Sequence, residues 1–156
     1  MSSKYKIGED AIPHFVTFTV VGWIDVFSRE MYKEKMLESL NFCIQKKGLV
    51  VYAWIIMTNH VHLIISSHDN KIADIVRDIK KFTSRQIIEL VAQNPKESRK
   101  AWMLNIFSFV GKGNNSKLVQ NFFSERENYT IMNEKIQFSP HFFFKWVQST
   151  GEIDFH

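Results

Sequence analysis

The sequence predicts a single domain of the α+β class, with a ferredoxin-like βαββαβ order of elements, an antiparallel sheet and a C-terminal helix. Its length of 156 residues suits one domain, spanning residues 1–156, with a core of its own. Alternating β-branched and aromatic residues predict strands, and apolar residues spaced three and four apart predict helices. In this fold the first and third strands are neighbours at the centre of the sheet.

The first half of the chain is expected to supply three strands and a helix. Phe, Val and Thr fill the first segment and predict a buried strand, and Ser28 and Gly48 are expected to cap and stop the helix. The two later strands are joined by the short turn at Thr58 and Asn59. The predicted strand, helix, strand and strand cover residues 14–22, 29–47, 49–57 and 60–66.

The second half predicts a long amphipathic helix, a shorter helix, two strand pieces and a final helix. These elements cover residues 71–92, 97–109, 118–123, 128–132 and 140–148. Asp69 or Asn70 is expected to cap the long helix, and Pro95 to follow its end. Its apolar stripe predicts a buried face made of Ile72, Ile75, Val76, Ile79, Phe82, Ile87 and Leu90. Trp54 and Trp102 are expected in the core.

His60 and His62 lie inside an apolar run, with Val61 between them. Because strand side chains alternate between faces, the two imidazoles project to the same side. Neutral imidazole is the commonest protein metal ligand, so the pair predicts half of a divalent-metal site. A third ligand would be an Asp, Glu, Asn or Gln from elsewhere. The alternative is a solvated pair of histidines without a ligand role.

The middle of the chain is basic. Residues 71–117 hold ten Lys or Arg against four Asp or Glu, a net +6, whereas the whole chain is +4 and the remainder therefore −2. This asymmetry suggests a polyanionic partner, with phosphate as the natural candidate. The residues expected to contact a nucleic-acid backbone share one face of the long helix: Arg77, Lys80, Lys81 and Arg85. The alternative is a merely solvated helix face.

Composition excludes several classes of protein. Cys43 is the only cysteine, so no intrachain disulfide forms and a reducing compartment is expected. No apolar stretch is long enough to span a membrane, and the N-terminus lacks the apolar segment of a signal peptide. We therefore expect a cytoplasmic protein with no membrane partner.

Three segments resemble the single-tyrosine HUH transposases, the group of REP-associated tyrosine transposases and small insertion-sequence transposases. Residues 54–64, which hold Asn59-His60-Val61-His62, are similar to the His-hydrophobe-His motif of that family. Residues 13–19 resemble its first strand, and residues 74–84 its basic helix. Together the likeness covers most of residues 12–124.

The resemblance implies metal-dependent cleavage and joining of single-stranded DNA at hairpin ends during DNA transposition. In the family, a tyrosine attacks a DNA phosphate, while two His and a third polar residue hold Mg²⁺ or Mn²⁺. The resemblance assigns His60 and His62 as metal ligands and Gln148 as the third. It also implies action on bacterial DNA, in the nucleoid. Insertion-sequence relatives work as homodimers, whereas REP-associated relatives act as monomers.

The nucleophile departs from the family pattern. The position that matches the family tyrosine is Phe144, which has no hydroxyl group. Tyr129 would be a relocated nucleophile if residues 129–133 were helical; otherwise it belongs to the last strand. Three hypotheses therefore stay open: a transposase, a non-catalytic nucleic-acid-binding module of the same fold, and a small metal hydrolase that uses an activated water.

Overall fold

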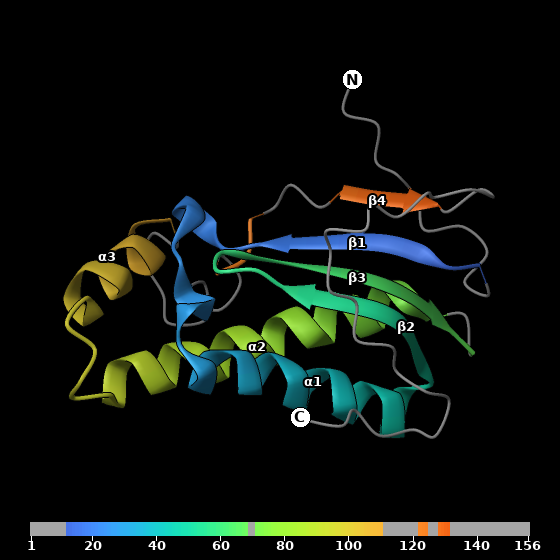
Figure 1. The fold of residues 1–156 in the computed structure, drawn as a ribbon, viewed down its shortest axis with the longest axis horizontal. Helices are drawn as coiled ribbons and strands as arrows, with labels where there is room; N and C mark the ends of the chain where they lie inside the picture. The colour runs from blue at the N-terminus through green and yellow to red at the C-terminus, as the bar shows by residue number, and fades with distance from the viewer. Residues whose placement is uncertain (1–11, 69–70, 111–121, 125–127, 132–156) are drawn as a thin grey trace.

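The computed structural model describes residues 12–68, 71–110, 122–124 and 128–131. Figure 1 shows a layer of strands packed against two long helices. The four strands form one antiparallel sheet in the order β2-β3-β1-β4. Their bounds are β1 His14–Thr19, β2 Leu49–Ile56, β3 His60–Ser67 and β4 Asn128–Ile131. The predicted α+β class is confirmed, and β1 and β3 are central neighbours as the ferredoxin-like order requires.

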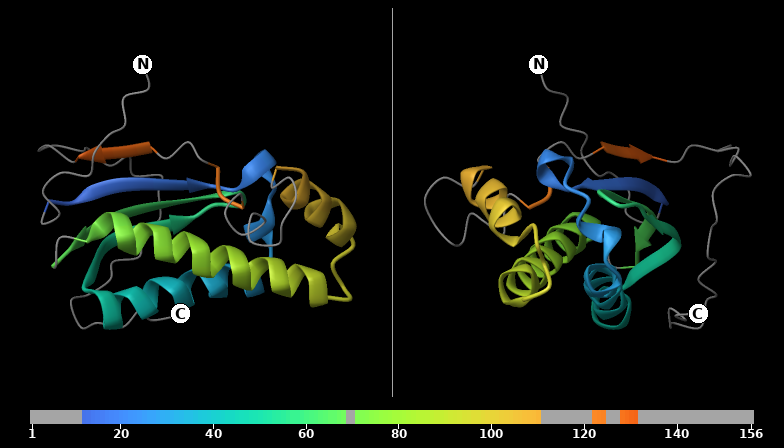
Figure 2. Two further views of the ribbon diagram at one scale, coloured as in Figure 1. Left: turned by 180° about the vertical axis from the view of Figure 1, so that it is seen from behind. Right: turned by 60° about the vertical axis from the view of Figure 1, so that its left-hand side comes forward.

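Helices α1 (Glu30–Lys47) and α2 (Ile72–Gln93) cover one face of this sheet. Both views in Figure 2 place them side by side on the same side of the strands. Alternate residues of β1 face the helices and are buried, namely His14, Val16 and Phe18. None of the described helices covers the opposite face, which is where Phe15, Thr17 and Thr19 lie. The sheet therefore has one face in the core and one face free of described helices.

The first strand ends earlier than the sequence predicts, and the chain then turns sharply. Strand β1 stops at Thr19 and a single 3-10 turn, η1 (Val21–Trp23), follows. Gly22 and Trp23 both have positive φ, 65° and 56°. Gly22 adopts this left-handed conformation without steric cost, but tryptophan does not. The left-handed pair breaks the strand, so the prediction of a strand to residue 22 was wrong at its end.

Helix boundaries depend on contacts that the sequence pattern did not reveal. Gly48 ends α1 in the left-handed conformation, as predicted. Ser28, however, does not cap α1, because its hydroxyl donates to the Asp25 carbonyl inside the 3-10 turn η2 (Val26–Ser28). The N-cap position of α2 is Lys71, without a side-chain hydrogen bond, and Asp69 and Asn70, the predicted caps, lie outside the described residues.

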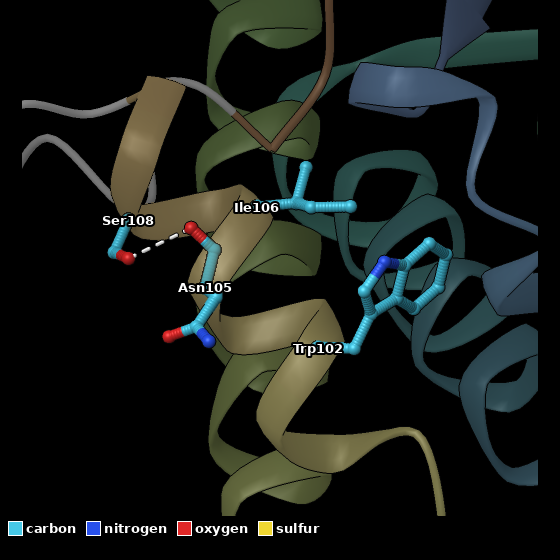
Figure 3. A pocket seen from close by; sticks show the side chains of 4 residues that line it. All are labelled: Trp102, Asn105, Ile106 and Ser108. Carbon is cyan, nitrogen blue, oxygen red and sulfur yellow. Dashed lines mark hydrogen bonds between the residues drawn. The ribbon is translucent and has the colours of Figure 1, made fainter.

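Two aromatic residues expected in the core are exposed. Phe82, at 45% exposure, lies beside the groove between α1 and α2, although the other predicted apolar positions of α2 are buried or partly buried against the core. Trp102 is 51% exposed on α3 (Lys100–Val110), which starts three residues later than predicted. Figure 3 shows Trp102 and Ile106 pointing to one side of α3, where they help line an open depression of about 520 Å³.

Only part of the C-terminal third is described. Strand β4 lies within the predicted strand over 128–132 and pairs with β1. In the predicted strand over 118–123, Phe123 forms an isolated bridge with Val20, and residues 118–121 fall outside the described ranges. The predicted helix over 140–148 also lies outside the described residues. Within the described chain, no helix is both long enough and apolar enough to cross a membrane.

A buried carboxylate ties the start of α1 to the connection between α2 and α3. Glu97 has a fully buried side chain, which accepts hydrogen bonds from Arg29 at 2.6 Å and Arg99 at 3.2 Å. The Tyr32 hydroxyl donates to the same carboxylate at 3.3 Å, and Arg99 also pairs with Asp25. Burial alone would raise the pKa of Glu97, but the two guanidinium groups outweigh it and hold that pKa below its ordinary value.

We predict that Glu97→Gln lowers the free energy of unfolding by about 3 kcal/mol, because it leaves partly buried guanidinium groups without their counter-charge. Chemical denaturation at pH 7 would measure the loss. Since the pKa of Glu97 is lowered by folding, its contribution is present above about pH 4.3 and is lost as the pH falls. The two proteins should therefore converge in acid.

The control for this prediction is Glu38→Gln, which removes the exposed pair between Glu38 and Lys35. An exposed pair of this kind contributes at most about 1 kcal/mol. Equal losses from both substitutions would contradict the special role of the Glu97 cluster.

Candidate functional site

His60 and His62 lie at the start of β3, on the sheet face that no described helix covers. The register sets them opposite two residues of β1: Thr19 pairs with His60, and Thr17 pairs with His62. Val61, between them, is fully buried on the helix side. The two imidazole rings are neighbours, with centroids 4.7 Å apart and an angle of 74° between their planes. The prediction that both rings share one face agrees with this arrangement.

Each imidazole is held by a hydrogen bond at its Nδ1 atom. Thr17 Oγ1 lies 2.8 Å from Nδ1 of His62, and Asn59 Oδ1 lies 2.6 Å from Nδ1 of His60. Because an amide oxygen only accepts, His60 carries its proton on Nδ1 and its Nε2 is left with a free lone pair. The Asn59 amide is itself oriented, since its nitrogen donates to the Trp23 carbonyl at 3.4 Å. Such contacts fix the ring orientation of a metal-binding histidine.

The surroundings favour the neutral form of both rings. Burial lowers the pKa of His60 below its ordinary value. Burial also lowers the pKa of His62, and the neighbouring His60 lowers it further. Neutral imidazole is the form that binds a metal ion, so the pair is ready to act as ligands at neutral pH.

The described residues supply two candidate metal ligands, His60 and His62. Among them, no cluster of three or more His, Cys, Asp or Glu side chains could hold an ion. Gln148, which the family resemblance assigns as third ligand, and Phe144, at the family's tyrosine position, lie outside the described residues. The donor set fits a divalent cation in part. Two neutral imidazoles with hydrogen-bonded Nδ1 atoms suit such an ion, and the other coordination positions would need oxygen ligands.

Tyr129 is not part of a described helix. It lies in strand β4 and pairs with Val16, a fully buried residue on the helix side of β1. The helical setting proposed for a relocated nucleophile was therefore wrong, and the strand alternative is the one observed.

Aromatic rings flank the His pair, and the sequence did not predict the position of one of them, that of Trp23. Phe15 stacks on His62, with centroids 5.2 Å apart and a 22° angle between the planes. Trp23 meets His60 edge-on at 6.5 Å and is 70% exposed. Trp23 lies beside the site because of the left-handed turn after β1. In the sequence, Gly22 is the one residue that indicates such a turn.

The predicted DNA-binding residues lie on α2, apart from the His pair. Arg77, Lys81 and Arg85 are exposed on the side of α2 that faces away from the sheet, and Lys80 is half-buried at its flank. Acidic neighbours offset some of their charge. Arg77 pairs with Asp74 and Asp78, and Arg85 pairs with Glu89. The helix layer thus separates this basic face from His60 and His62.

A groove of about 320 Å³ runs between α1 and α2 on that same side. It combines basic and aromatic side chains, and its lining consists of Ser39, Phe42, Cys43, Lys47, Asp78, Lys81, Phe82 and Arg85. Lys47 forms an ion pair with Asp78 across it. Burial raises the pKa of the Cys43 thiol to about 11, so this cysteine is not a reactive thiolate at neutral pH.

Comparisons with known proteins agree with this architecture. A structure of a REP-associated tyrosine transposase bound to a REP hairpin superposes with a TM-score of 0.54 at 14% identity, covering 86% of this chain but only 64% of that one. A candidate transposase from Deinococcus radiodurans superposes with a TM-score of 0.50 at 16% identity, covering 79% and 80%. At these identities the two structures establish a shared fold.

The sequence comparison is more specific. No curated protein sequence matches the chain. The family model described as "Transposase IS200 like" matches residues 11–126, which include β1, the His pair and all of α2. Since this match spans well over half of the 156 residues, the chain belongs to the IS200-like transposase family.

Proposed function

We propose that this chain binds single-stranded or hairpin DNA in DNA transposition and holds Mg²⁺ or Mn²⁺ against a DNA phosphate through His60 and His62. The observation that carries the proposal is the pair of imidazoles on one sheet face, with both Nδ1 atoms hydrogen-bonded and the pKa of both rings lowered by burial. The family match supports the class of activity. The hairpin bound by the REP-associated relative supports the class of DNA.

In this proposal the protein's contribution is to position the ligands. Thr17 and Asn59 hold the two neighbouring imidazoles through their Nδ1 atoms, and Gln148 would supply the third ligand by family resemblance. A cation bound there would polarise a phosphoryl oxygen and stabilise the charge that develops during phosphate attack. Strand β3 is paired on both sides and gives the site a rigid base.

The basic face of α2 is proposed to hold the DNA backbone. Phosphates attract Lys and Arg at any sequence, and exposed ion pairs such as that of Arg85 with Glu89 cost little to break. Because this face and the His pair are separated by the helix layer, we infer that they contact different parts of the DNA.

The nucleophile distinguishes this proposal from a second candidate. By family resemblance Phe144 stands at the tyrosine position, and Tyr129 lies in strand β4 rather than in a helix. Both points favour the second candidate, in which the unaltered chain is a non-catalytic DNA-binding module of the same fold. A metal site that has lost only its nucleophile would regain cleavage when the hydroxyl is restored.

We predict that the chain binds Mn²⁺ in calorimetric titration, and that His62→Ala abolishes this binding. Thr17→Val should weaken it by about 10- to 100-fold, because the anchor of one ligand is lost. Since burial lowers the pKa of both imidazoles, binding should persist below pH 6.5 and fall only in more acidic solution. His68→Ala is the control, and an equal loss there would contradict the assignment.

We predict that Lys81→Gln and Arg85→Gln each weaken hairpin binding at all sequences. Each should also reduce the slope of log K against log salt by about one, the value for one lost phosphate contact. Fluorescence anisotropy across a salt series measures both effects. Lys35→Gln on α1 is the control. An unchanged slope for the α2 variants would identify their face as merely solvated.

We predict that the unaltered chain forms no covalent adduct with a labelled hairpin oligonucleotide in Mn²⁺, and that Phe144→Tyr does. The added hydroxyl supplies the missing nucleophile, and denaturing electrophoresis would detect the DNA-linked protein. The double variant Phe144→Tyr/His62→Ala should form none. An adduct on the unaltered chain that disappears in Tyr129→Phe would refute both this prediction and the strand-based argument about Tyr129.

A further inference from the structure

We propose that Trp23 is a stacking platform for one unpaired nucleobase of the DNA strand that passes the His pair. This inference rests on the proposed function, because it names the part of the DNA that the site would recognise. Trp23 is the most exposed large hydrophobic side chain in the described part of the chain, at 70%. It nevertheless contacts His60, so its free ring surface borders the metal ligands.

The rings around the site form a continuous row. Phe15 stacks on His62 at 5.2 Å, His62 meets His60 at 4.7 Å, and His60 meets Trp23 at 6.5 Å. Phe15 lies at one end of the row, and the solvent-exposed ring of Trp23 lies at the other. A nucleotide whose phosphate lay at the two Nε2 atoms would have its neighbouring bases within reach of the ends of this row. An unpaired base has two π-faces, and an exposed indole is suited to stack on one of them.

The backbone holds this exposed indole in a costly conformation. A φ of 56° is uncommon for a bulky residue and costs on the order of 1–3 kcal/mol unless surrounding contacts impose it. Those contacts are present. Gly22, at φ 65°, packs beside Ile106 of α3, which would lie at an ordinary contact distance of 3.4 Å from an added Cβ, and the Trp23 nitrogen donates to the Val20 carbonyl at 3.1 Å.

The same turn serves the metal ligands. The Trp23 carbonyl accepts from the Asn59 amide, and that amide sets the proton position of His60. Strain, exposure and contact with the site therefore coincide at one residue. A packing role alone would not explain why the ring of this residue is 70% exposed. The ligand class that fits is a nucleobase, recognised by its π-face and so largely independent of its identity.

The test measures affinity for a hairpin with a short single-stranded flank, in Mn²⁺, while an abasic site is moved through the flank. With the unaltered chain, one abasic position should weaken binding about tenfold. Trp23→Ala should weaken binding of the intact flank by a similar factor. In this variant, making that position abasic should cause no further loss of affinity. Trp23→Phe retains a ring and should restore most of the affinity.

Two variants separate stacking from structure. Trp23→Gly removes the ring and also relieves the positive φ, so it should lose the same affinity without loss of thermal stability. Trp102→Ala removes another half-exposed indole, which has no ring contact with His60, and should keep the abasic penalty intact.

The inference is overturned if Trp23→Ala binds the intact flank as well as the unaltered chain does, or keeps the full abasic penalty. If the unaltered chain binds no hairpin at all, the proposed function fails and takes this inference with it. If binding survives but every abasic position is tolerated, only the role of Trp23 fails.

Discussion

The pairing of β1 with β3 is the constraint on which the site depends. This register sets Thr17 opposite His62 and buries Val61 with the helix-facing side chains of both strands. A slip of one residue would turn the imidazoles into the core and expose Val61. Burial of the apolar face thus also determines that both imidazoles lie on the opposite face. Backbone hydrogen bonds hold the turn before β3, because Val20 donates to the Asn59 carbonyl and Phe27 to that of Thr58.

Features set by short-range periodicity could be predicted from the sequence. Strand alternation was sufficient to put His60 and His62 on one face, and a glycine after a basic helix end was sufficient to locate the end of α1 at Gly48. The order of the elements gave the central place of β1 and β3. The charge pattern identified the exposed face of α2, although it did not reveal how many acidic neighbours accompany those cations.

Features set by tertiary contacts could not be predicted. Ser28 looks like a helix cap, but its hydroxyl is used inside a 3-10 turn. The sequence pattern puts Glu97 in the first turn of α3, but its side chain is buried before that helix, where it pairs with Arg29 and Arg99. Phe82 fits the apolar stripe of α2 and still lies at the edge of that stripe, beside the open groove. Trp23 carries no periodic signal, since its position depends on a left-handed turn that packs on α3.

The left-handed turn at Gly22 also gives the site a remote point of sensitivity. Ile106 of α3 abuts Gly22, the Trp23 carbonyl that follows orients Asn59, and Asn59 sets the tautomer of His60. Gly22 has no side chain, yet its φ of 65° would strain any other residue at this position and with it the contacts that lead to His60. The arrangement of the His pair therefore depends in part on a residue that has no side chain and lies in another segment of the fold.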